Sequence, residues 1–115
     1  MSKKIVSDFP QKVYNLCSQI PKGYVSTYKC IAEFINSSPR AVGQVLKNNP
    51  NSPIVPCHRV IASNYFIGGF WGEWGVGKEI EVKKKKLAEE KVFFNKRGYL
   101  LKKLRTVSVF KNFHC

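Results

Sequence analysis

The sequence predicts a mostly α-helical domain with short strands, in which two adjacent helices form a helix-turn-helix pattern. Three observations lead to this fold class. Apolar residues recur at helical spacing, the helical segments begin at residues suited to capping, and a segment rich in glycine and aromatic residues is too irregular for one regular element. At 115 residues the chain can form one domain with a hydrophobic core, but not two.

The first helix is predicted within SDFPQKVYNLCSQIP, where Ser7 or Asp8 would cap it and Pro10 would lie in its first turn. Its apolar stripe consists of Phe9, Val13, Leu16, Cys17 and Ile20. Because Cys17 lies on this stripe, we expect it to be a core residue.

A second helix is predicted to begin at Thr27, after a glycine turn and a short extended piece at residues 24–26. The residues expected on its inner face are Ile31, Phe34 and Ile35.

A third helix follows in SPRAVGQVLKNNP, with Ser38 as its cap and Pro39 at its first position. Its inward residues would be Val42, Val45 and Leu46, and its stop would be Asn48, Asn49 and Pro50. Two short helices with a tight junction are typical of DNA-binding domains, but an ordinary helical hairpin fits the pattern equally well.

The outward face of the third helix carries small residues around a single cation. Pro39, Ala41 and Gly43 are small, and Arg40 stands among them. Glycine inside a helix costs about 1 kcal/mol relative to alanine, so its presence needs a reason. In one interpretation the helix backbone approaches another surface closely and Arg40 reaches into a groove or between bases. In the other, Gly43 serves helix packing beside a solvated arginine.

The remaining segments are predicted in less detail. SNYFIGGFWGEWGVGKE indicates a loop with short strand pieces that could form one wall of a pocket. EIEVKKKKLAEEKV predicts a fourth helix with a thin apolar stripe, and most of Lys83 to Lys86 are expected to be solvated or to face phosphates. The stripe consists of Ile80, Val82 and Leu87. The tail predicts a hairpin or short strands around NKRG. We expect residues 1–91 to form the functional domain and residues 92–115 a basic extension packed on it.

The net charge of +13 favours polyanionic partners, with nucleic acid first and an anionic membrane surface second, although a general charge bias would give the same composition. The 4 cysteines form no CxxC pair and there is no histidine cluster at zinc spacing, so neither a disulfide framework nor a metal site is expected. No segment is long enough to span a bilayer, and the first residues lack the apolar run of a signal peptide. We therefore expect an intracellular protein with reduced thiols.

The stretch NSPIVPCHRVIAS surrounds one thiol with an imidazole and a guanidinium. A cysteine reacts as its thiolate, so Cys57 would need a base or a cation nearby. His58 could take the proton directly or through water, and Arg59 would add positive potential. A carboxylate could orient the imidazole. The 7 candidates are Asp8, Glu33, Glu73, Glu79, Glu81, Glu89 and Glu90. Without further context, a small buried hydrophobe beside a satisfied histidine would be the simpler interpretation of Cys57.

The motifs together resemble the O6-alkylguanine-DNA alkyltransferases, repair proteins that move an alkyl group from guanine to their own cysteine. The matching segments are PCHRV at 56–60, SPRAVGQVLKNNP at 38–50, GYVSTY at 23–28 and IGGF at 67–70. The resemblance covers roughly Phe9 to Glu90, the family's C-terminal catalytic domain, and implies a winged helix-turn-helix-like fold. It also implies irreversible repair of O6-alkylguanine in double-stranded DNA after nucleotide flipping, without a cofactor. We expect a monomer, able to cluster on DNA, in the cytoplasm or nucleoid, or in the nucleus of a eukaryote.

The resemblance also implies roles for individual residues. Cys57 would be the nucleophile and alkyl acceptor, and His58 would activate it through a water. Glu90 would orient the imidazole, with Glu89 as the second choice. Asn49 would tie the turn to the cysteine segment. Tyr28 would help to swing out the nucleotide and is the candidate proton donor to the departing guanine.

The alkyl pocket and the DNA surface follow from the same matching. The pocket residues would be Tyr28, Leu46, Val60, Phe70 and Trp71. The residues against DNA would be Thr27, Tyr28, Arg40, Ala41, Gly43, Lys47 and Ser63. Arg40 would be the finger that fills the vacated place in the duplex, while the third helix lies in the minor groove.

One feature departs from the family pattern, and two other functions stay open. WGVGKE at 74–79 looks like an insertion of about six residues before the helix that carries Glu90. A non-enzymatic relative that only binds the lesion is one alternative, although such relatives have another residue at the position of Cys57. A basic protein that coats DNA without chemistry is the other, and it predicts salt-dependent binding without preference for damage.

Overall fold

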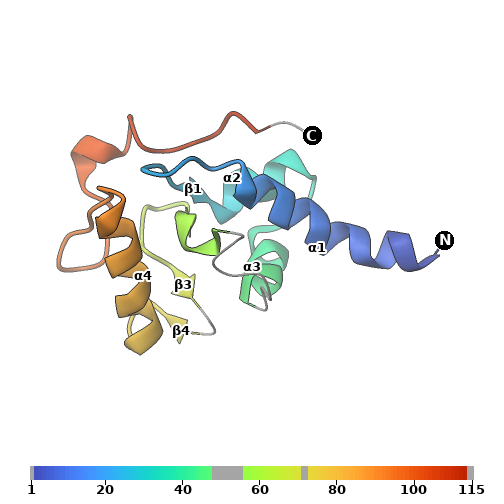
Figure 1. The fold of residues 1–115 in the computed structure, drawn as a ribbon, viewed down its shortest axis with the longest axis horizontal. Helices are drawn as coiled ribbons and strands as arrows, with labels where there is room; N and C mark the ends of the chain where they lie inside the picture. The colour runs from blue at the N-terminus through green and yellow to red at the C-terminus, as the bar shows by residue number, and fades with distance from the viewer. Residues whose placement is uncertain (1, 48–55, 71–72, 114–115) are drawn as a thin grey trace.

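The computed structural model describes residues 2–47, 56–70 and 73–113. It shows a mostly helical fold with two small two-stranded sheets (Figure 1), which confirms the predicted fold class. The elements in chain order are α1 (Ser2–Ser18), β1 (Ser26–Thr27), α2 (Tyr28–Phe34), α3 (Pro39–Lys47), the 3-10 turn η1 (Cys57–Arg59), β2 (Val60–Ile61), β3 (Gly69–Phe70), β4 (Glu73–Trp74), α4 (Lys78–Glu89) and the 3-10 turn η2 (Lys102–Leu104). In the described part of the chain, no helix combines the length and the apolar character needed to cross a membrane.

The helix-turn-helix pair is formed by α2 and α3, and both predicted caps are confirmed. The Thr27 hydroxyl accepts a hydrogen bond from the backbone N–H of Cys30 at 3.0 Å. The Ser38 hydroxyl accepts one from the N–H of Ala41 at 3.1 Å. Each cap satisfies a backbone donor that the first helical turn leaves without a partner, and so fixes where its helix begins.

The start of α1 differs from the prediction. The helix begins at Ser2, before the expected cap at Ser7 or Asp8, and Pro10 lies inside it. The preceding residues include lysines, which have good helix propensity, so the helix can extend in front of the proline. The buried stripe is close to the one predicted, because Val13, Leu16 and Cys17 lie in the core.

Two short strand pairs hold the middle of the chain. β1 and β2 are parallel, with Ser26 opposite Val60 and Thr27 opposite Ile61. β3 and β4 are antiparallel, with Gly69 opposite Trp74. The first pair joins the start of α2 to the end of η1, so segments that are distant in sequence meet where Tyr28 and Cys57 begin their elements.

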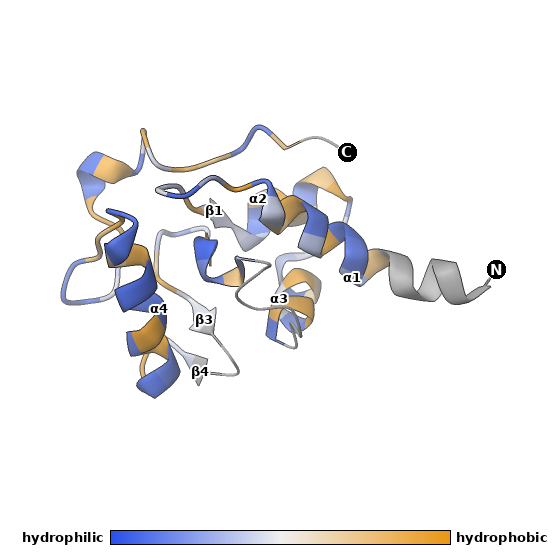
Figure 2. Cartoon of the chain, viewed as in Figure 1, coloured by the Kyte–Doolittle hydropathy of each residue, from blue (hydrophilic) through white to orange (hydrophobic). Residues whose placement is uncertain are grey.

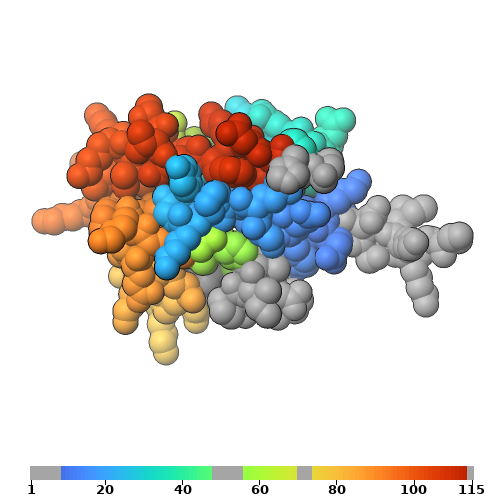
Figure 3. Space-filling model, turned by 45° about the horizontal axis from the view of Figure 1, so that its top comes forward, coloured from blue at the N-terminus to red at the C-terminus, as the bar shows by residue number. Residues whose placement is uncertain are grey.

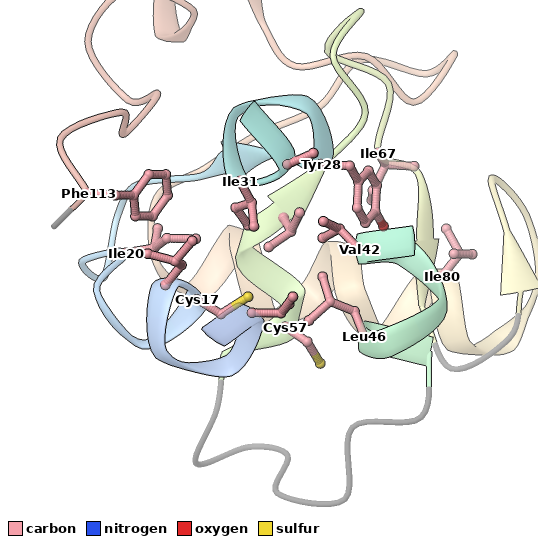
Figure 4. Close-up of a cluster of buried hydrophobic side chains, with 14 residues drawn as sticks. Cys17, Ile20, Tyr28, Ile31, Val42, Leu46, Cys57, Ile67, Ile80 and Phe113 are labelled. Atoms are coloured by element: carbon pink, nitrogen blue, oxygen red, sulfur yellow. The ribbon is translucent and has the colours of Figure 1, made fainter. Parts of the chain in front are cut away.

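The main core lies between α1, α2, α3 and the η1 segment (Figure 4). Its buried residues are Val13, Leu16, Cys17, Ile20, Tyr28, Ile31, Ala32, Val42, Leu46, Cys57, Val60, Ile67, Ile80 and Phe113. Figure 2 shows the corresponding change from hydrophobic to hydrophilic residues around α3 and α4. Phe34, predicted on the inner face of α2, is instead largely exposed at 41%, and its ring contacts Phe113 of the tail.

The prediction for the lysine run of α4 was wrong at Lys83. Its side chain is fully buried, whereas Val82, predicted on the apolar stripe, is exposed at 38%. The buried face of α4 is formed by Ile80, Lys83 and Leu87, which are three and four residues apart, as one face of a helix requires. The long methylene chain of Lys83 allows it to occupy a core position, provided that its ammonium group finds polar partners inside.

The tail runs back across the molecule and packs against α1 and α2 (Figures 1 and 3). The N–H of Val25 donates to the carbonyl of Ser108 at 2.8 Å, and the N–H of Phe110 donates to the carbonyl of Val25 at 2.7 Å. Leu100 is buried in a second cluster with Val25 and other residues. The turn predicted around NKRG is present, because Asn95 N–H donates to the carbonyl of Tyr99 at 2.8 Å.

Candidate functional site

The thiol of Cys57 lies on a tight turn that the neighbouring sheet holds in place. The N–H of Arg59 donates to the carbonyl of Pro56 at 3.0 Å, and the N–H of Val60 donates to the carbonyl of Cys57. Val60 then enters β2, which pairs with β1. The turn is therefore anchored beside Tyr28, the first residue of α2.

Cys57 borders a pocket of about 400 Å³, called here the Cys57 pocket. Its lining residues are Tyr28, Lys29, Pro39, Arg40, Gly43, Gln44, Leu46, Lys47, Cys57, Ala62, Ser63, Gly69 and Trp74. Only 6% of Cys57 is exposed, and Figure 4 shows it next to Leu46 of α3 at the edge of the core. Cys57 therefore lies at the border between the hydrophobic core and the pocket.

His58, the next residue, contacts Glu90 at the end of α4. Its Nε2 atom lies 3.1 Å from Glu90 Oε2. Since a carboxylate only accepts hydrogen bonds, Nε2 carries the proton in this pair and Nδ1 is the nitrogen that can accept one. Burial lowers the pKa of His58, and the hydrogen bond and charge of Glu90 oppose this shift only in part. The imidazole is therefore neutral at neutral pH and suited to act as a base.

Arg59 fixes the position of Glu90. Its Nε donates to Oε1 at 2.9 Å, its Nη2 donates to Oε2 at 2.9 Å, and its Nη1 donates to the carbonyl of Ile20 at 2.8 Å. Burial alone would raise the pKa of Glu90, but the hydrogen bonds from Arg59 and His58 outweigh it and lower the pKa. The guanidinium was predicted to add positive potential at the thiol, and the structure places it against Glu90 instead.

Tyr28 is held against the glycine-rich loop at the pocket wall. Its hydroxyl lies 3.4 Å from the carbonyl of Gly69 and accepts a hydrogen bond from the Gly69 N–H at 3.3 Å. A side chain at Gly68 would not fit, because φ there is +78° and a Cβ would lie 3.1 Å from Tyr28 Cε2. Burial raises the pKa of Tyr28 to about 12, although the Gly69 hydrogen bond opposes this shift. The phenol is therefore a proton donor rather than a phenolate near neutral pH.

Lys83 joins the segments that form this wall. Its Nζ donates to the carbonyls of Val60 and Ile67 at 2.7 Å each and to the carbonyl of Gly69 at 2.9 Å. Burial lowers its pKa to about 7. One buried amine thus ties the segment after Cys57 to the loop that contacts Tyr28.

The predicted DNA-binding residues are brought together only in part. Tyr28, Arg40, Gly43, Lys47 and Ser63 line the Cys57 pocket. Arg40 and Lys47 are exposed, and Ala41, half-buried, follows Arg40 in α3. Among the described residues, a Cβ added at Gly43 would meet nothing within 4 Å, so internal packing does not explain this glycine.

Three other predicted positions need separate mention. Thr27 is only 5% exposed and its hydroxyl caps α2, so its side chain is already engaged. Val60, predicted to line the pocket, is fully buried in the core instead. Asn49, Trp71 and the side chain of Phe70 lie outside the described residues.

Sequence reasoning missed two residues of this site, Lys83 and Trp74. The spacing of Ile80, Lys83 and Leu87 could have placed Lys83 on the buried face of α4. Trp74 carried no comparable signal, because its position at the pocket depends on how β4 pairs with β3. Within the described part of the chain, no group of three or more His, Cys, Asp or Glu residues could hold a metal ion.

Comparisons with known proteins place this chain among DNA methyltransferase relatives. Residues 8–92 match the family described as 6-O-methylguanine DNA methyltransferase, DNA binding domain. A methylated-DNA–protein-cysteine methyltransferase of Pyrobaculum aerophilum is 49% identical over 71 residues, which are 62% of this chain and 44% of that protein. The crystal structure of O6-methylguanine-DNA methyltransferase from Pyrococcus kodakaraensis has a TM-score of 0.64 at 42% identity, covering 76% of this chain and 48% of that one.

A third similar protein matches over a longer part of its own length. The structure of S. pombe Atl1 in complex with damaged DNA containing O6-carboxymethylguanine has a TM-score of 0.73 at 31% identity, covering 91% of this chain and 96% of that one. In contrast, the chain spans about half the length of the methyltransferase relatives. The family match extends over most of the 115 residues and includes every segment that builds the Cys57 pocket. The chain therefore belongs to the 6-O-methylguanine DNA methyltransferase family.

Proposed function

We propose that this protein repairs O6-alkylguanine in double-stranded DNA by transferring the alkyl group irreversibly to Cys57. The observation that carries the proposal is the position of the Cys57 thiol on the wall of a pocket of about 400 Å³, next to a histidine held by Glu90. The names of the relatives support the same reaction, since several are methylated-DNA–protein-cysteine methyltransferases.

The reaction requires only groups of this chain. His58 accepts the proton of the Cys57 thiol, directly or through a water, and Glu90 stabilises the resulting imidazolium. The thiolate sulfur attacks the alkyl carbon, an S–C bond forms, and the C–O6 bond breaks with its electron pair going to guanine. Guanine then needs a proton, and Tyr28 is the candidate donor because its phenol, whose pKa burial raises, is protonated near neutral pH. The thioether has no leaving route, so each molecule reacts once.

The DNA-facing residues supply access to the lesion. The oxygen of a paired guanine cannot reach a thiol that is 6% exposed, so the nucleotide must be flipped out. The open space at Gly43 allows the backbone of α3 to approach the minor groove. Arg40, exposed on the same helix, would fill the vacated place in the duplex. Lys29 and Lys47 at the pocket are suited to phosphate contacts.

The proposal is tested by the intact mass of the protein after incubation with a duplex that carries one O6-methylguanine. We expect one methyl group per protein, located on the Cys57 peptide and saturating at one equivalent. The Cys57→Ala variant should retain lesion binding and gain no mass. The matched Cys30→Ala variant should still be methylated. Methyl transfer that persists in Cys57→Ala would refute the assignment of the acceptor.

A second candidate function is lesion binding without transfer. The observation in its favour is the match to S. pombe Atl1, which was crystallised with damaged DNA and which this chain covers over 96% of its length. Under this alternative, the wild-type protein would bind the O6-methylguanine duplex more tightly than undamaged duplex and would gain no mass. The same mass measurement therefore separates the two functions.

A further inference from the structure

One large aromatic side chain at the Cys57 pocket has no role in the proposed reaction. Trp74 lines the pocket together with Cys57, and 60% of it is exposed. It lies on β4, in the segment that the sequence predicts to be an insertion. A tryptophan left exposed at the wall of a concave site offers a flat apolar surface to whatever enters.

The hairpin holds Trp74 in a defined place. Trp74 pairs with Gly69 across β3 and β4, and the N–H of Gly75 donates to the carbonyl of Gly68 at 2.8 Å. The Phe66 ring centroid lies 6.2 Å from that of Trp74, with the ring planes tilted by 44°. Gly75 has φ of +75°, and a Cβ there would lie 2.8 Å from Phe66 Cζ, so only glycine allows this approach. The indole therefore contacts the Phe66 ring, and backbone hydrogen bonds anchor its strand.

Trp74 continues the wall that Tyr28 begins. The two ring centroids are 6.2 Å apart and the ring planes differ by 30°, a stacked arrangement. Tyr28 is itself fixed by Gly69, the residue opposite Trp74. Tyr28 and Trp74 thus contribute two neighbouring aromatic rings to the pocket lining, called here the aromatic wall, and 60% of Trp74 is still exposed.

We propose that Trp74 determines which O6 substituents this protein accepts, and that it favours flat aromatic groups over methyl. The inference rests on the proposed transfer to Cys57. A methyl group is too small to extend along the wall, whereas an aromatic ring attached through one CH₂ group can stack on it. Aromatic pairs gain about 0.5–1.5 kcal/mol beyond simple burial, which corresponds to roughly twofold to tenfold in rate or affinity. The transfer step is unchanged, with the sulfur bonding to the benzylic carbon and the C–O6 electron pair going to guanine.

The test compares two duplexes that are identical except for one O6-methylguanine or one O6-benzylguanine. Single-turnover transfer rates give a benzyl-to-methyl ratio for each protein. We expect Trp74→Ala to lower this ratio about fivefold to tenfold and Trp74→Phe to restore most of it. Val76→Ala is the matched control, because Val76 follows Trp74 by two residues and is 79% exposed. An unchanged ratio in Trp74→Ala would overturn the inference while leaving the proposed function intact.

A second measurement does not depend on transfer. Dissociation constants for both duplexes are determined in the Cys57→Ala background, with and without Trp74→Ala. The inference requires the preference for the benzyl lesion to fall when the indole is removed, and an equal preference in both proteins would refute it. The wild-type protein could gain no mass from either duplex while Trp74→Ala still lowers the preference in binding for the benzyl lesion. In that case the proposed transfer function is wrong, and the role of Trp74 in selecting the O6 substituent is supported.

Discussion

At the scale of single residues, the protonation of His58 is controlled by two opposing influences. Burial lowers the pKa of the imidazole, while the Glu90 carboxylate raises it. Arg59 holds that carboxylate with two hydrogen bonds, so its charge stays in place. As a result, the His58 imidazole is neutral, and Glu90 both fixes its orientation and controls its basicity.

Replacing Glu90 by glutamine should therefore change both the rate of transfer and its pH dependence. Without the carboxylate charge, the effect of burial is opposed less strongly, so the pKa of His58 falls further below the ordinary value of 6.5. A weaker and less well oriented base should slow transfer near neutral pH by about 100-fold. The acidic limb of the rate–pH profile should also move to lower pH, as measured by single-turnover methyl transfer.

The neighbouring acid provides the control for this prediction. Glu89 is exposed and has the same charge, and sequence reasoning named it as the second choice for the same role. Glu89→Gln should leave the rate and the profile close to wild type. A limb that moves to higher pH in Glu90→Gln would show that His58 is not the base.

The residues that sequence could not predict are those whose position depends on tertiary contacts. Cys57, His58 and Glu90 were predicted as a set, and the structure brings His58 and Glu90 into contact. Lys83 was assigned to solvent because a run of four lysines normally faces water. Its burial requires the carbonyls of three separate segments to converge on one amine, and no local pattern encodes that convergence.

At the scale of elements, α3 combines a well-defined start with an outer face on which Gly43 leaves open space among the described residues. The Ser38 cap and Pro39 at the first position set where the helix begins, and both were predicted from sequence. The start of α1 was not predicted correctly, because the residues before Pro10 can extend a helix without any cap signal. Val42 and Leu46 fix one side of α3 in the core, which leaves the side with Arg40 facing outward.

Arg40→Ala should weaken repair of a duplex far more than reaction with the free alkylated base. The duplex substrate needs the flipped-out state, whose unstacking costs a few kcal/mol that an inserted arginine would offset. A loss of at least about tenfold in the duplex rate is expected. The measurement is the transfer rate on an O6-methylguanine duplex and on free O6-methylguanine, compared for each protein.

A control must separate the loss of positive charge in Arg40→Ala from the loss of a side chain that inserts into the duplex. Arg97→Ala removes the same charge from an exposed position in the tail, away from α3. It should reduce both rates only slightly and in proportion. Equal losses on both substrates in Arg40→Ala would show that this arginine does not act in flipping.

At the scale of the whole molecule, Lys83 couples the stability of the fold to pH. Its amine binds the carbonyls of Val60, Ile67 and Gly69, so it connects α4 to β2, to β3 and to the loop between them. Removal of the amine would leave three buried acceptors without a donor, at a cost of about 3 kcal/mol in the free energy of unfolding. The ammonium form has three N–H donors for these three carbonyls and the neutral amine has two, so the size of this effect depends on whether the amine is charged.

The direction of the pH dependence follows from the lowered pKa. The ordinary lysine value is 10.5 and burial lowers that of Lys83 to about 7. Between these values the unfolded chain binds a proton that the folded chain does not, so the free energy of unfolding rises with pH. This contribution is complete above pH 10.5 and is lost as the pH falls through about 7.

Lys83→Met should therefore be destabilised relative to wild type by an amount that grows from pH 7 towards pH 10. Urea unfolding at several pH values, at a fixed high salt concentration, measures the difference between the two proteins. Lys85→Met is the control, since Lys85 is exposed on the same helix and carries the same charge. Its difference from wild type should be small and independent of pH. A gap for Lys83→Met that stays constant over this range would mean that the buried amine keeps its proton, so that α4 is attached to the pocket wall by an ammonium group rather than by a neutral amine.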